Sequence, residues 1–330
     1  MATCLVTGGA GFIGGMTARV LLDHGHRVVV LDDFSRGHRG ALDPRGTLEE
    51  GDIRDRRRVR ELLDAYRPDC VLHFAALAYV GESFDAPMRY FDVNIGGSVV
   101  LLEAMVEAGV PACVFSSSCT VYGEPDTLPL TEDAPLKPPV SPYGQSKLTV
   151  EQLLGWMGRT GPLRSLCLRY FNAAGAVRDH GEDHAPETHL IPLAIDAALG
   201  RRPPLRVFGD DYPTRDGTCV RDYVHVADLA DAHRLAMDRL LAGAALPPAI
   251  NLGSETGSTV REVLRAVEDV TGLAVPHVLG PRRDGDAPAL VAGAALAREV
   301  LGWAPTRSSL HEIVLSAYSW RREHPDGYGD

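Results

Sequence analysis

Short runs of apolar and β-branched residues alternate with longer amphipathic segments through the first half of the chain. The short runs predict strands near residues 3–7, 28–32, 47–50, 70–74, 112–116 and 164–169. The segments between them predict helices near 12–24, 55–66, 87–108 and 143–158. Helices of this length can cross a sheet and return the next strand in parallel. The pattern therefore predicts an α/β chain with a doubly wound parallel sheet of the Rossmann type.

The alternation stops after residue 172, where loops rich in Gly, Pro, His and charged residues are expected over 178–188 and 209–217. Further elements are predicted as a helix near 189–200, a strand near 205–208 and a helix near 258–271. Segments near 224–241 and 249–253 again resemble a helix and a strand of the sheet. We therefore predict a Rossmann domain over 1–172 with returning segments near 224–253, and a smaller, mixed α/β substrate-binding region, discontinuous, over 173–330.

The chain has 330 residues, with 33 Lys and Arg against 44 Asp and Glu, which gives a net charge of −11. A net acidic chain has no general basic field for nucleic acid or an anionic membrane surface, so any phosphate must be bound locally. The sequence shows no signal-peptide pattern and no apolar run long enough for a membrane span. Six scattered cysteines without a C-x-x-C pair are typical of a reducing compartment, so we expect a cytoplasmic protein.

A glycine-rich turn follows the first predicted strand, with Gly8, Gly11 and Gly14 at G-x-x-G-x-x-G spacing. Such glycines allow a tight turn and let a pyrophosphate approach the N–H groups of the next helix. An acidic pair, Asp32 and Asp33, ends the second strand, where a carboxylate would accept the adenosine ribose hydroxyls and repel a 2′-phosphate. The motif thus predicts bound NAD rather than NADP, although Arg36 and Arg39 lie close by in the sequence.

A second motif is Tyr143-x-x-x-Lys147 on a predicted helix, preceded by Ser116, Ser117 and Ser118 at the end of a strand. The i,i+4 spacing places the phenol and the ammonium on one helical face. A tyrosine acting as a base near pH 7 needs its pKa lowered by roughly three units, on the order of 4 kcal/mol. Lys147 and an oxidised nicotinamide ring would supply the positive charges for that shift, and Ser118 would hydrogen-bond the reacting hydroxyl.

These motifs belong to a larger set that runs along nearly the whole chain. The set comprises Gly51-Asp52-Ile53, His73-Phe74-Ala75-Ala76, Val80-Gly81-Glu82-Ser83, Ser116 to Gly123, Ser141 to Lys147, Arg169-Tyr170-Phe171-Asn172, Gly209 to Thr214, Asp216 to Tyr223, Pro281 to Asp286 and His324 to Tyr328. In this combination the chain resembles the extended short-chain dehydrogenase/reductases, and within them the UDP-glucose 4-epimerases.

The resemblance implies a division of the site residues between cofactor, sugar and nucleotide. It places around NAD the residues Gly8, Gly11, Phe12, Ile13, Asp32, Asp52, Ile53, Phe74, Ala75, Ala76, Asn94, Ser116, Tyr143, Lys147 and Tyr170. It gives the catalytic roles to Ser118, Tyr143 and Lys147. It places around the UDP-sugar the residues Ser118, Asn172, His189, Leu190, Phe208, Arg221, Arg283, Asp286 and Leu290. It also implies a homodimer joined through the 87–108 and 143–158 helices.

Three positions depart from the pattern of these relatives. Ala78 stands where some carry lysine, and Val93 stands where some carry asparagine, so a cofactor contact is missing or supplied elsewhere. Leu290 occupies a position that varies between bulky Tyr and small Cys in relatives and borders the sugar. The acceptance of an N-acetyl group therefore stays open, as does a pentose or uronate substrate.

Other interpretations of the chain are weaker. His180, His184 and His189 with Glu182 and Asp183 suggest a metal site, but the stretch contains Gly181 and Pro186 and the chemistry needs no metal, so none is expected. A 4,6-dehydratase would place an Asp-Glu pair after the catalytic Ser or Thr, where this chain has Cys119-Thr120. A net dehydrogenase would accumulate NADH, and a non-catalytic NAD-binding regulator would not require Ser118, Tyr143 and Lys147 together.

Overall fold

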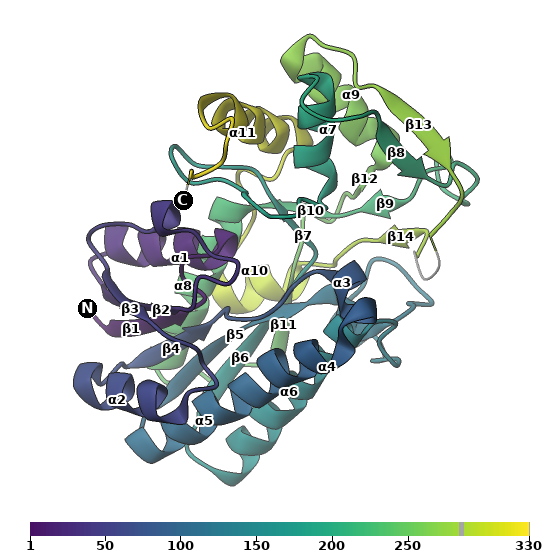
Figure 1. Cartoon of the computed structure of the whole chain (residues 1–330). Coiled ribbons are helices and arrows are strands. Elements are labelled where there is room, and N and C mark those ends of the chain that lie inside the picture. The colour runs from purple at the N-terminus through teal and green to yellow at the C-terminus, as the bar shows by residue number, and fades with distance from the viewer. Residues whose placement is uncertain (284–286, 330) are drawn as a thin grey trace.

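A computed structural model describes residues 1–283 and 287–329. Its centre is a parallel sheet of seven strands in the order β11-β6-β5-β4-β1-β2-β3 (Figure 1). The strands are β1 (Thr3–Thr7), β2 (Arg27–Asp32), β3 (Thr47–Glu50), β4 (Cys70–His73), β5 (Ala112–Ser118), β6 (Arg164–Tyr170) and β11 (Ala249–Leu252). The order reverses direction between β1 and β4, which confirms the predicted doubly wound sheet.

Helices cover both faces of the sheet, because alternate residues of each strand point to opposite sides. On one face, Cys4 and Val6 of β1 pack with α1 (Phe12–Asp23), α8 (Val226–Leu241) and α10 (Ala295–Leu301). On the other face, Leu5 of β1 packs with α2 (Arg56–Tyr66), α5 (Gly97–Ala108) and α6 (Pro142–Thr160). The two hydrophobic cores leave the carboxyl ends of the strands as the edge where functional loops gather.

The helix predicted near 87–108 is interrupted rather than regular. It consists of α4 (Pro87–Tyr90), a π-helical stretch η2 (Phe91–Gly96) and α5, and a further short helix α3 (Val80–Asp85) precedes it. The Asn94 side chain in the π-helical stretch bonds to both the N–H and the C=O of Leu77. The wider turn therefore ties this helix to the loop that follows β4.

Segments far along the chain return to the sheet. Strand β11 pairs in parallel with β6, and α8 packs beside α1. The predicted helix near 224–241 and strand near 249–253 are therefore elements of the sheet layer, while the domain division itself stays a prediction. Helix α10 under the sheet and the 14-residue α11 (Leu310–Glu323) in the second region have no counterpart in the sequence analysis.

The second region consists of small sheets and three packed helices above the carboxyl edge of the main sheet (Figure 1). Its helices are α7 (Leu190–Ala198), α9 (Val260–Thr271) and α11. Its strands are β7 (Asn172–Ala174), β8 (Leu205–Phe208), β9 (Val220–Arg221), β10 (Tyr223–His225), β12 (Ser258–Thr259), β13 (His277–Gly280) and β14 (Ala289–Leu290). Two 3₁₀ turns, η1 (Arg39–Ala41) and η3 (Cys119–Tyr122), complete the elements.

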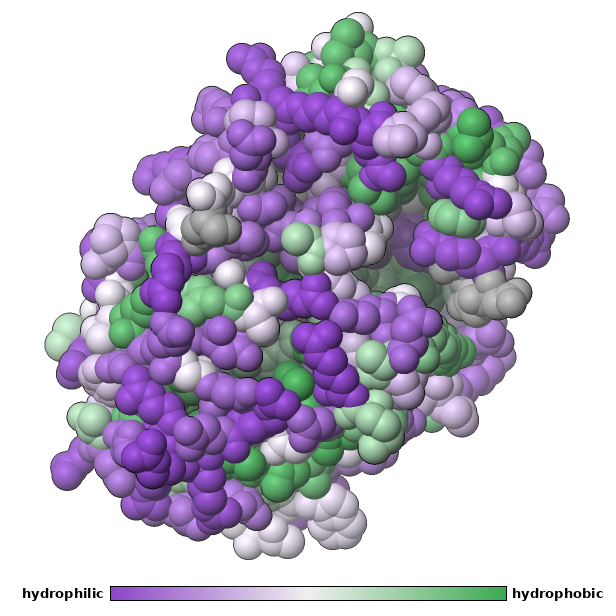
Figure 2. Space-filling model, viewed as in Figure 1, coloured by the Kyte–Doolittle hydropathy of each residue, from purple (hydrophilic) through white to green (hydrophobic). Residues whose placement is uncertain are grey.

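The surface is hollowed where the second region meets the sheet layer, and apolar residues form the floor of the recess (Figure 2). All six cysteines are buried and form no disulfide. Burial of this kind is typical of free cysteines that pack as small apolar residues. Among the described residues, no helix combines the length and apolar character needed to cross a bilayer.

Candidate active site

The glycine turn between β1 and α1 is built from backbone alone. Gly8 has a φ of +71°, and its N–H donates to Leu31 O at 2.8 Å. A Cβ on Gly14 would lie 2.2 Å from Gly8 O, so only glycine lets the helix approach the turn. Gly11 caps α1 without a side-chain hydrogen bond, and the first turn of α1 holds no acidic residue. The N-terminal N–H groups of α1 therefore fit the pyrophosphate of a dinucleotide.

Asp32 closes the same site at the end of β2. Its carboxylate is 7% exposed and accepts hydrogen bonds from Ala10 N and Phe34 N, each at 2.9 Å. Burial raises the pKa of Asp32, which these backbone hydrogen bonds partly offset. A cavity of about 270 Å³ lies beside it, lined by residues 34–39 and Ala185. The position fits the adenosine ribose of the predicted cofactor.

The two arginines near Asp32 are engaged within the protein. Arg36 Nη2 lies 2.7 Å from Glu82 Oε1, and its Nη1 donates to Ala185 O at 2.8 Å. The guanidinium of Arg39 stacks 4.1 Å from the centroid of the Phe34 ring and pairs with Glu50. Since both already have acceptors, they do not form a ready site for a 2′-phosphate, and the geometry favours NAD over NADP.

Loops that follow β3 and β4 bring further predicted cofactor residues to this edge. Asp52 pairs with Arg54, and the Arg54 hydrogen bonds lower the pKa of Asp52. Ile53 is buried against Gly97, where an added Cβ would lie 2.6 Å from Ile53 Cδ1. Phe74 N and Ala75 N both donate to Thr7 O, which anchors the segment that continues to Ala76.

Asn94, also predicted to contact NAD, is 3% exposed and fully engaged by the protein. Besides its bonds to Leu77, its Nδ2 donates to Ser146 Oγ at 2.9 Å. Asn94 therefore links the loop after β4 to α6, and in this structure it positions both elements.

The predicted catalytic residues come together at the end of β5 and the start of α6. Ser118 Oγ accepts hydrogen bonds from Thr120 N at 3.3 Å and Thr120 Oγ1 at 3.1 Å. Tyr143 is 9% exposed, and its hydroxyl lies close enough to Ser118 for the serine to lower its pKa. Lys147 is 3% exposed, and its Nζ donates to Ser116 O at 2.7 Å and lies 5.8 Å from the centroid of the Tyr143 ring. The site thus gathers a hydroxyl, a phenol and an amine in one buried corner.

The pKa of Tyr143 differs from the expected direction. Burial raises it to about 12, and the hydrogen bond from Ser118 only partly opposes that rise. Burial also lowers the pKa of Lys147 to about 7, with Glu151 acting in the opposite direction. The expectation counted Lys147 and the nicotinamide as cations but not the cost of burying the phenolate and the ammonium in an apolar corner.

Tyr170 and His233 lie beside this corner. The Tyr170 hydroxyl hydrogen-bonds Ser116 Oγ. His233 on α8 is fully buried, with its ring centroid 4.6 Å from that of Phe74 and 5.8 Å from that of Tyr170. Burial lowers the pKa of His233 to about 4, so this ring is neutral near pH 7 and completes an aromatic wall.

The predicted UDP-sugar residues are distributed over the second region in two groups. Arg221 on β9 is the register partner of Leu290 on β14, and its Nη1 donates to Val220 O and Ala287 O, each at 2.9 Å. Arg283 stacks 4.3 Å from the centroid of the Phe208 ring. Asp286, the remaining acidic prediction, lies outside the described residues.

Asn172, His189 and Leu190 form the second group, on β7 and at the start of α7. Asn172 on β7 donates through Nδ2 to Asp222 O at 2.9 Å. His189 is the N-terminal cap residue of α7, and Leu190 is its first residue. An N-terminus of a nine-residue helix at this point is consistent with the predicted contact to a diphosphate.

A buried ion pair behind the catalytic corner escaped the sequence analysis. Arg169 binds Glu151 bidentately, with Nη2–Oε2 at 2.6 Å and Nε–Oε1 at 2.9 Å, and both side chains are 7% exposed. Ser117 Oγ donates to the same carboxylate at 2.5 Å. Glu151 stands four residues after Lys147, so the i,i+4 spacing that marks the Tyr-Lys pair could have revealed it.

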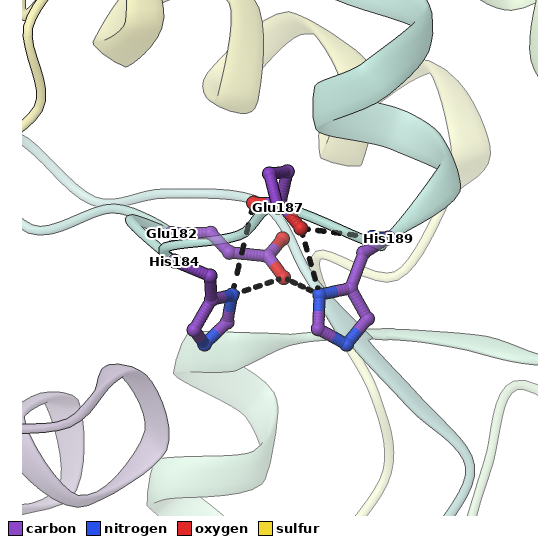
Figure 3. Close-up of side chains that lie close together, drawn as sticks. All are labelled: Glu182, His184, Glu187 and His189. Carbon is purple, nitrogen blue, oxygen red and sulfur yellow. Dashed lines mark hydrogen bonds and ion pairs between the residues drawn. The ribbon is translucent and has the colours of Figure 1, made fainter. Parts of the chain in front are cut away.

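The five residues weighed as metal ligands separate into two sets in the structure. His180 Nε2 contacts Phe12 O at 2.7 Å, and Asp183 accepts a hydrogen bond from Tyr328 N. Neither residue therefore belongs to the cluster of possible metal ligands. Glu182, His184 and His189 converge with Glu187, which the sequence analysis did not name (Figure 3). Although burial opposes it, the carboxylates raise the pKa of His184 to about 9 and of His189 to about 10.

Comparisons with known proteins agree with a dinucleotide-dependent enzyme of the Rossmann type. Residues 4–253 match the model of the NAD dependent epimerase/dehydratase family, and the chain belongs to this family. A UDP-glucose 4-epimerase of Rhizobium leguminosarum bv. trifolii is 52% identical over 320 residues, covering 96% of this chain and 97% of the relative.

Two solved structures extend the comparison. A UDP-glucose 4-epimerase from Brucella ovis in complex with NAD is 46% identical, with a TM-score of 0.93, covering 97% of this chain and 98% of the other. The UDP-Glc/GlcNAc 4-epimerase from Campylobacter jejuni is 36% identical, with a TM-score of 0.86, covering 98% of this chain and 100% of the other.

Proposed function

We propose that the chain is a UDP-glucose 4-epimerase, which interconverts UDP-glucose and UDP-galactose through a 4-keto intermediate while NAD stays bound. The observation that carries this proposal is the gathering of Ser118, Tyr143 and Lys147 at the carboxyl edge of the sheet, beside the Gly8–Gly14 turn. The full-length similarity to 4-epimerases supports the same conclusion. When bound, NAD supplies the acceptor and later the donor of the hydride at the sugar C4.

Tyr143 acts as the base that removes the proton from the sugar 4-hydroxyl and later returns it. Ser118 lies beside Tyr143, lowers its pKa and orients the reacting hydroxyl. Because burial raises the pKa of Tyr143 to about 12, its phenolate must be stabilised by positive charge near the ring. Lys147 is the buried amine of the corner, and its bond to Ser116 O fixes its position.

Arg221 and Arg283 hold the UDP diphosphate, while the sugar is bound more loosely. Two guanidinium groups offer bidentate donors to a diphosphate and neutralise it locally in an acidic protein. Leu290, the register partner of Arg221, gives the sugar side an apolar contact. A 4-keto sugar that turns about its diphosphate link can then present its other face for the return of hydride and proton.

The experiment is incubation of the purified protein with UDP-hexoses, without added cofactor, followed by NMR of the sugar. We expect UDP-galactose and UDP-glucose to interconvert to equilibrium with no accumulation of free NADH. In a parallel incubation with added NAD⁺, steady accumulation of NADH would instead identify a net dehydrogenase. Binding of UDP-sugars with no change at C4 over long incubation would identify a non-catalytic protein.

A second candidate is a 4-epimerase that also accepts UDP-N-acetylhexosamines, because a 36% identical relative carries the name UDP-Glc/GlcNAc 4-epimerase. Leu290 is intermediate in size at the position that borders the sugar. The same NMR experiment with UDP-N-acetylglucosamine decides between a single and a dual substrate class. UDP-pentoses and UDP-uronates extend the panel, since the contacts to C5 are not assigned.

We also propose a homodimer that works in the cytoplasm. Large apolar side chains are exposed on α3, α4 and α6, with Phe84 at 58%, Met88 at 74% and Trp156 at 62%. Exposed apolar side chains of this size suit a surface that another protein covers. Light scattering should give twice the chain mass, and Trp156→Glu should shift it toward the monomer. Cell fractionation tests the location, for which the reduced, buried cysteines are the support.

A further inference from the structure

We propose that Glu182, His184, Glu187 and His189 bind one divalent transition-metal ion, best matched by Zn²⁺, in the segment between β7 and α7. The four side chains point toward one another from a single short stretch with the spacing Glu-x-His-x-x-Glu-x-His (Figure 3). One ligand atom from each residue, an imidazole Nδ1 or a carboxylate oxygen, lies within 4.8 Å of the others. Two imidazoles and two carboxylates form a ligand set that zinc accepts.

The distances between ligand atoms, 2.8–3.7 Å, lie on both sides of those around a tetrahedral ion. Metal bonds of about 2.0–2.2 Å place the ligand atoms of a tetrahedron roughly 3.3–3.6 Å apart. His184 Nδ1 lies 3.3 Å from Glu182 Oε1 and 3.7 Å from Glu187 Oε2. His189 Nδ1 lies 2.8 Å from Glu182 Oε1 and 3.0 Å from Glu187 Oε1. Small side-chain rotations, without a change of the backbone, would bring all four atoms to one ion.

Hydrogen bonds alone leave this cluster incomplete. His184 Nδ1 and Glu187 Oε2 are buried atoms without a hydrogen-bond partner among the described residues. Such atoms are costly to bury unless a ligand or a water satisfies them. Glu187 Oε1, in contrast, accepts from Thr188 N at 2.7 Å and His189 N at 2.8 Å, which fixes the carboxylate so that Oε2 faces His184. These two atoms are held by ion pairs alone, His184 Nδ1 with Glu182 Oε1 at 3.3 Å and with Glu187 Oε2 at 3.7 Å, and a central cation would coordinate both.

Charge and enclosure also suit a metal. The two carboxylates keep both imidazoles protonated near pH 7, so the ion would displace two protons and leave four ligands with a charge of −2, which one divalent ion balances. The nearest cationic side chains already have carboxylate partners, since Arg321 pairs with Asp196 and Arg36 with Glu82. The Tyr79 ring lies edge-on to His184, with centroids 5.7 Å apart, and shields one side of the cluster. The carboxylates Glu182 and Glu187 are only 7% and 11% exposed.

The ion would fix the first turn of α7 to the segment that follows β7. His189 caps α7, and the proposed function places its backbone and Leu190 at the UDP diphosphate, so that part of the inference rests on the proposed function. Metal binding itself does not. If the chain binds Zn²⁺ but has no epimerase activity, only the proposed function is refuted. If the chain is an active epimerase but fails to bind Zn²⁺, only this inference is refuted.

The experiment measures metal content and affinity directly. The holoenzyme, depleted of metal with a chelator, is equilibrated with Zn²⁺, passed through a desalting column and analysed by mass spectrometry for metal. We expect about one Zn²⁺ per chain, and at least a roughly tenfold weaker affinity for His184→Ala and Glu187→Gln. His311→Ala, a change of an exposed histidine on α11, is the matched control and should bind as the wild type does.

A second measurement keeps the test valid if a variant fails to fold. Zn²⁺ should raise the melting temperature of the depleted wild-type protein, as binding to the native state requires, and Mg²⁺ should not. Retention of well under one ion per chain together with no thermal shift would overturn the proposal. Equal zinc affinity in the wild type, His184→Ala and His311→Ala would also overturn it, because the ion would then lie elsewhere.

Discussion

Ionisable groups are buried both in the catalytic corner around Tyr143 and Lys147 and in the cluster of Glu182, His184, Glu187 and His189. The pKa values of the basic groups in these two regions shift in opposite directions. Burial lowers the pKa of Lys147 to about 7, because its nearest bonded partner is the neutral carbonyl of Ser116. Two carboxylates raise the pKa of His184 to about 9 against the same effect of burial. Both bases are buried, so the difference in pKa comes from the group that each base contacts, a neutral carbonyl or two carboxylates.

The opposite pKa shifts agree with the role proposed for each region, which is proton transfer in the catalytic corner and cation binding in the cluster. In the catalytic corner, burial disfavours both the Tyr143 phenolate and the Lys147 ammonium. A further positive charge, such as that of the oxidised nicotinamide, would favour the phenolate and let Tyr143 act as a general base. A cluster with two fixed carboxylates instead attracts a permanent cation. The following experiments alter the catalytic corner, with an exposed ion pair on α2 as the last comparison, in order of decreasing effect.

Tyr143→Phe should have the largest effect. The substitution keeps the ring but removes the only group placed to exchange the proton of the sugar 4-hydroxyl. We expect kcat to fall roughly 10²–10⁴-fold, the usual range for losing a general acid–base. The rate of UDP-galactose conversion measures it, and circular dichroism checks the fold. Wild-type turnover by this variant would remove the phenolate from the mechanism.

Glu151→Gln should be the most destabilising of these changes. It leaves the Arg169 guanidinium buried without its bidentate carboxylate, and it also removes the charge that favours protonated Lys147. Breaking a buried pair by removing one partner costs about 3–5 kcal/mol. Urea denaturation gives the free energy of unfolding. A loss below about 1 kcal/mol would show that water or another group already satisfies Arg169.

Lys147→Met tests the direction of the lysine shift through the pH dependence of stability. An unfolded lysine keeps its proton up to about pH 10.4, whereas folded Lys147 releases it above about pH 7. Between these values the unfolded chain binds more protons, so the wild-type free energy of unfolding should rise with pH by up to about 1.4 kcal/mol per unit relative to the variant.

Urea denaturation at pH 7.5 and pH 9 measures this slope. The chain's other lysine, Lys137, pairs with Asp126 at the surface, with side chains 37% and 75% exposed, and Lys137→Met is the matched control without such a slope. A wild-type stability that fell relative to Lys147→Met over the same range would mean that Lys147 is stabilised as an ammonium.

Asp64→Asn should have the smallest effect. Its i,i+4 pair with Arg60 is exposed, with side chains 38% and 56% accessible, and lies on the solvent side of α2. Exposed pairs of this kind contribute about 0.3–0.5 kcal/mol. Urea denaturation should show little change in the free energy of unfolding. This small value serves as the comparison for the loss caused by Glu151→Gln. A loss comparable to that of Glu151→Gln would contradict the role given to burial.

The sheet and the cofactor half were predictable because their signals are local. The strand runs and the Gly8–Gly14 spacing depend on neighbouring residues, and each predicted strand of the sheet lies within two residues of its position in the structure. The i,i+4 spacing likewise placed Tyr143 and Lys147 on one face of α6. Periodicity could not reveal the π-helical stretch at Phe91–Gly96, because its wider turn changes the apolar register over only six residues.

Long-range contacts set the limits of the sequence analysis. Two-residue strands such as β9 and β14 carry no periodic signal, so the pairing of Arg221 with Leu290 came only from the structure. The pKa of Tyr143 depends on what encloses it, which spacing does not report. A loop prediction does not report where the chain folds back, and in the structure the fold brings Glu187 to His184.

The most direct test of the central claim is the fate of the hydrogen at the sugar C4. The protein is incubated with UDP-galactose deuterated at C4, in ordinary water and without added cofactor, and the UDP-glucose formed is analysed by NMR. Transfer through a bound NAD predicts that the deuterium stays at C4 of the product, while Tyr143 exchanges only the hydroxyl proton. Replacement of the deuterium by solvent hydrogen would contradict the account.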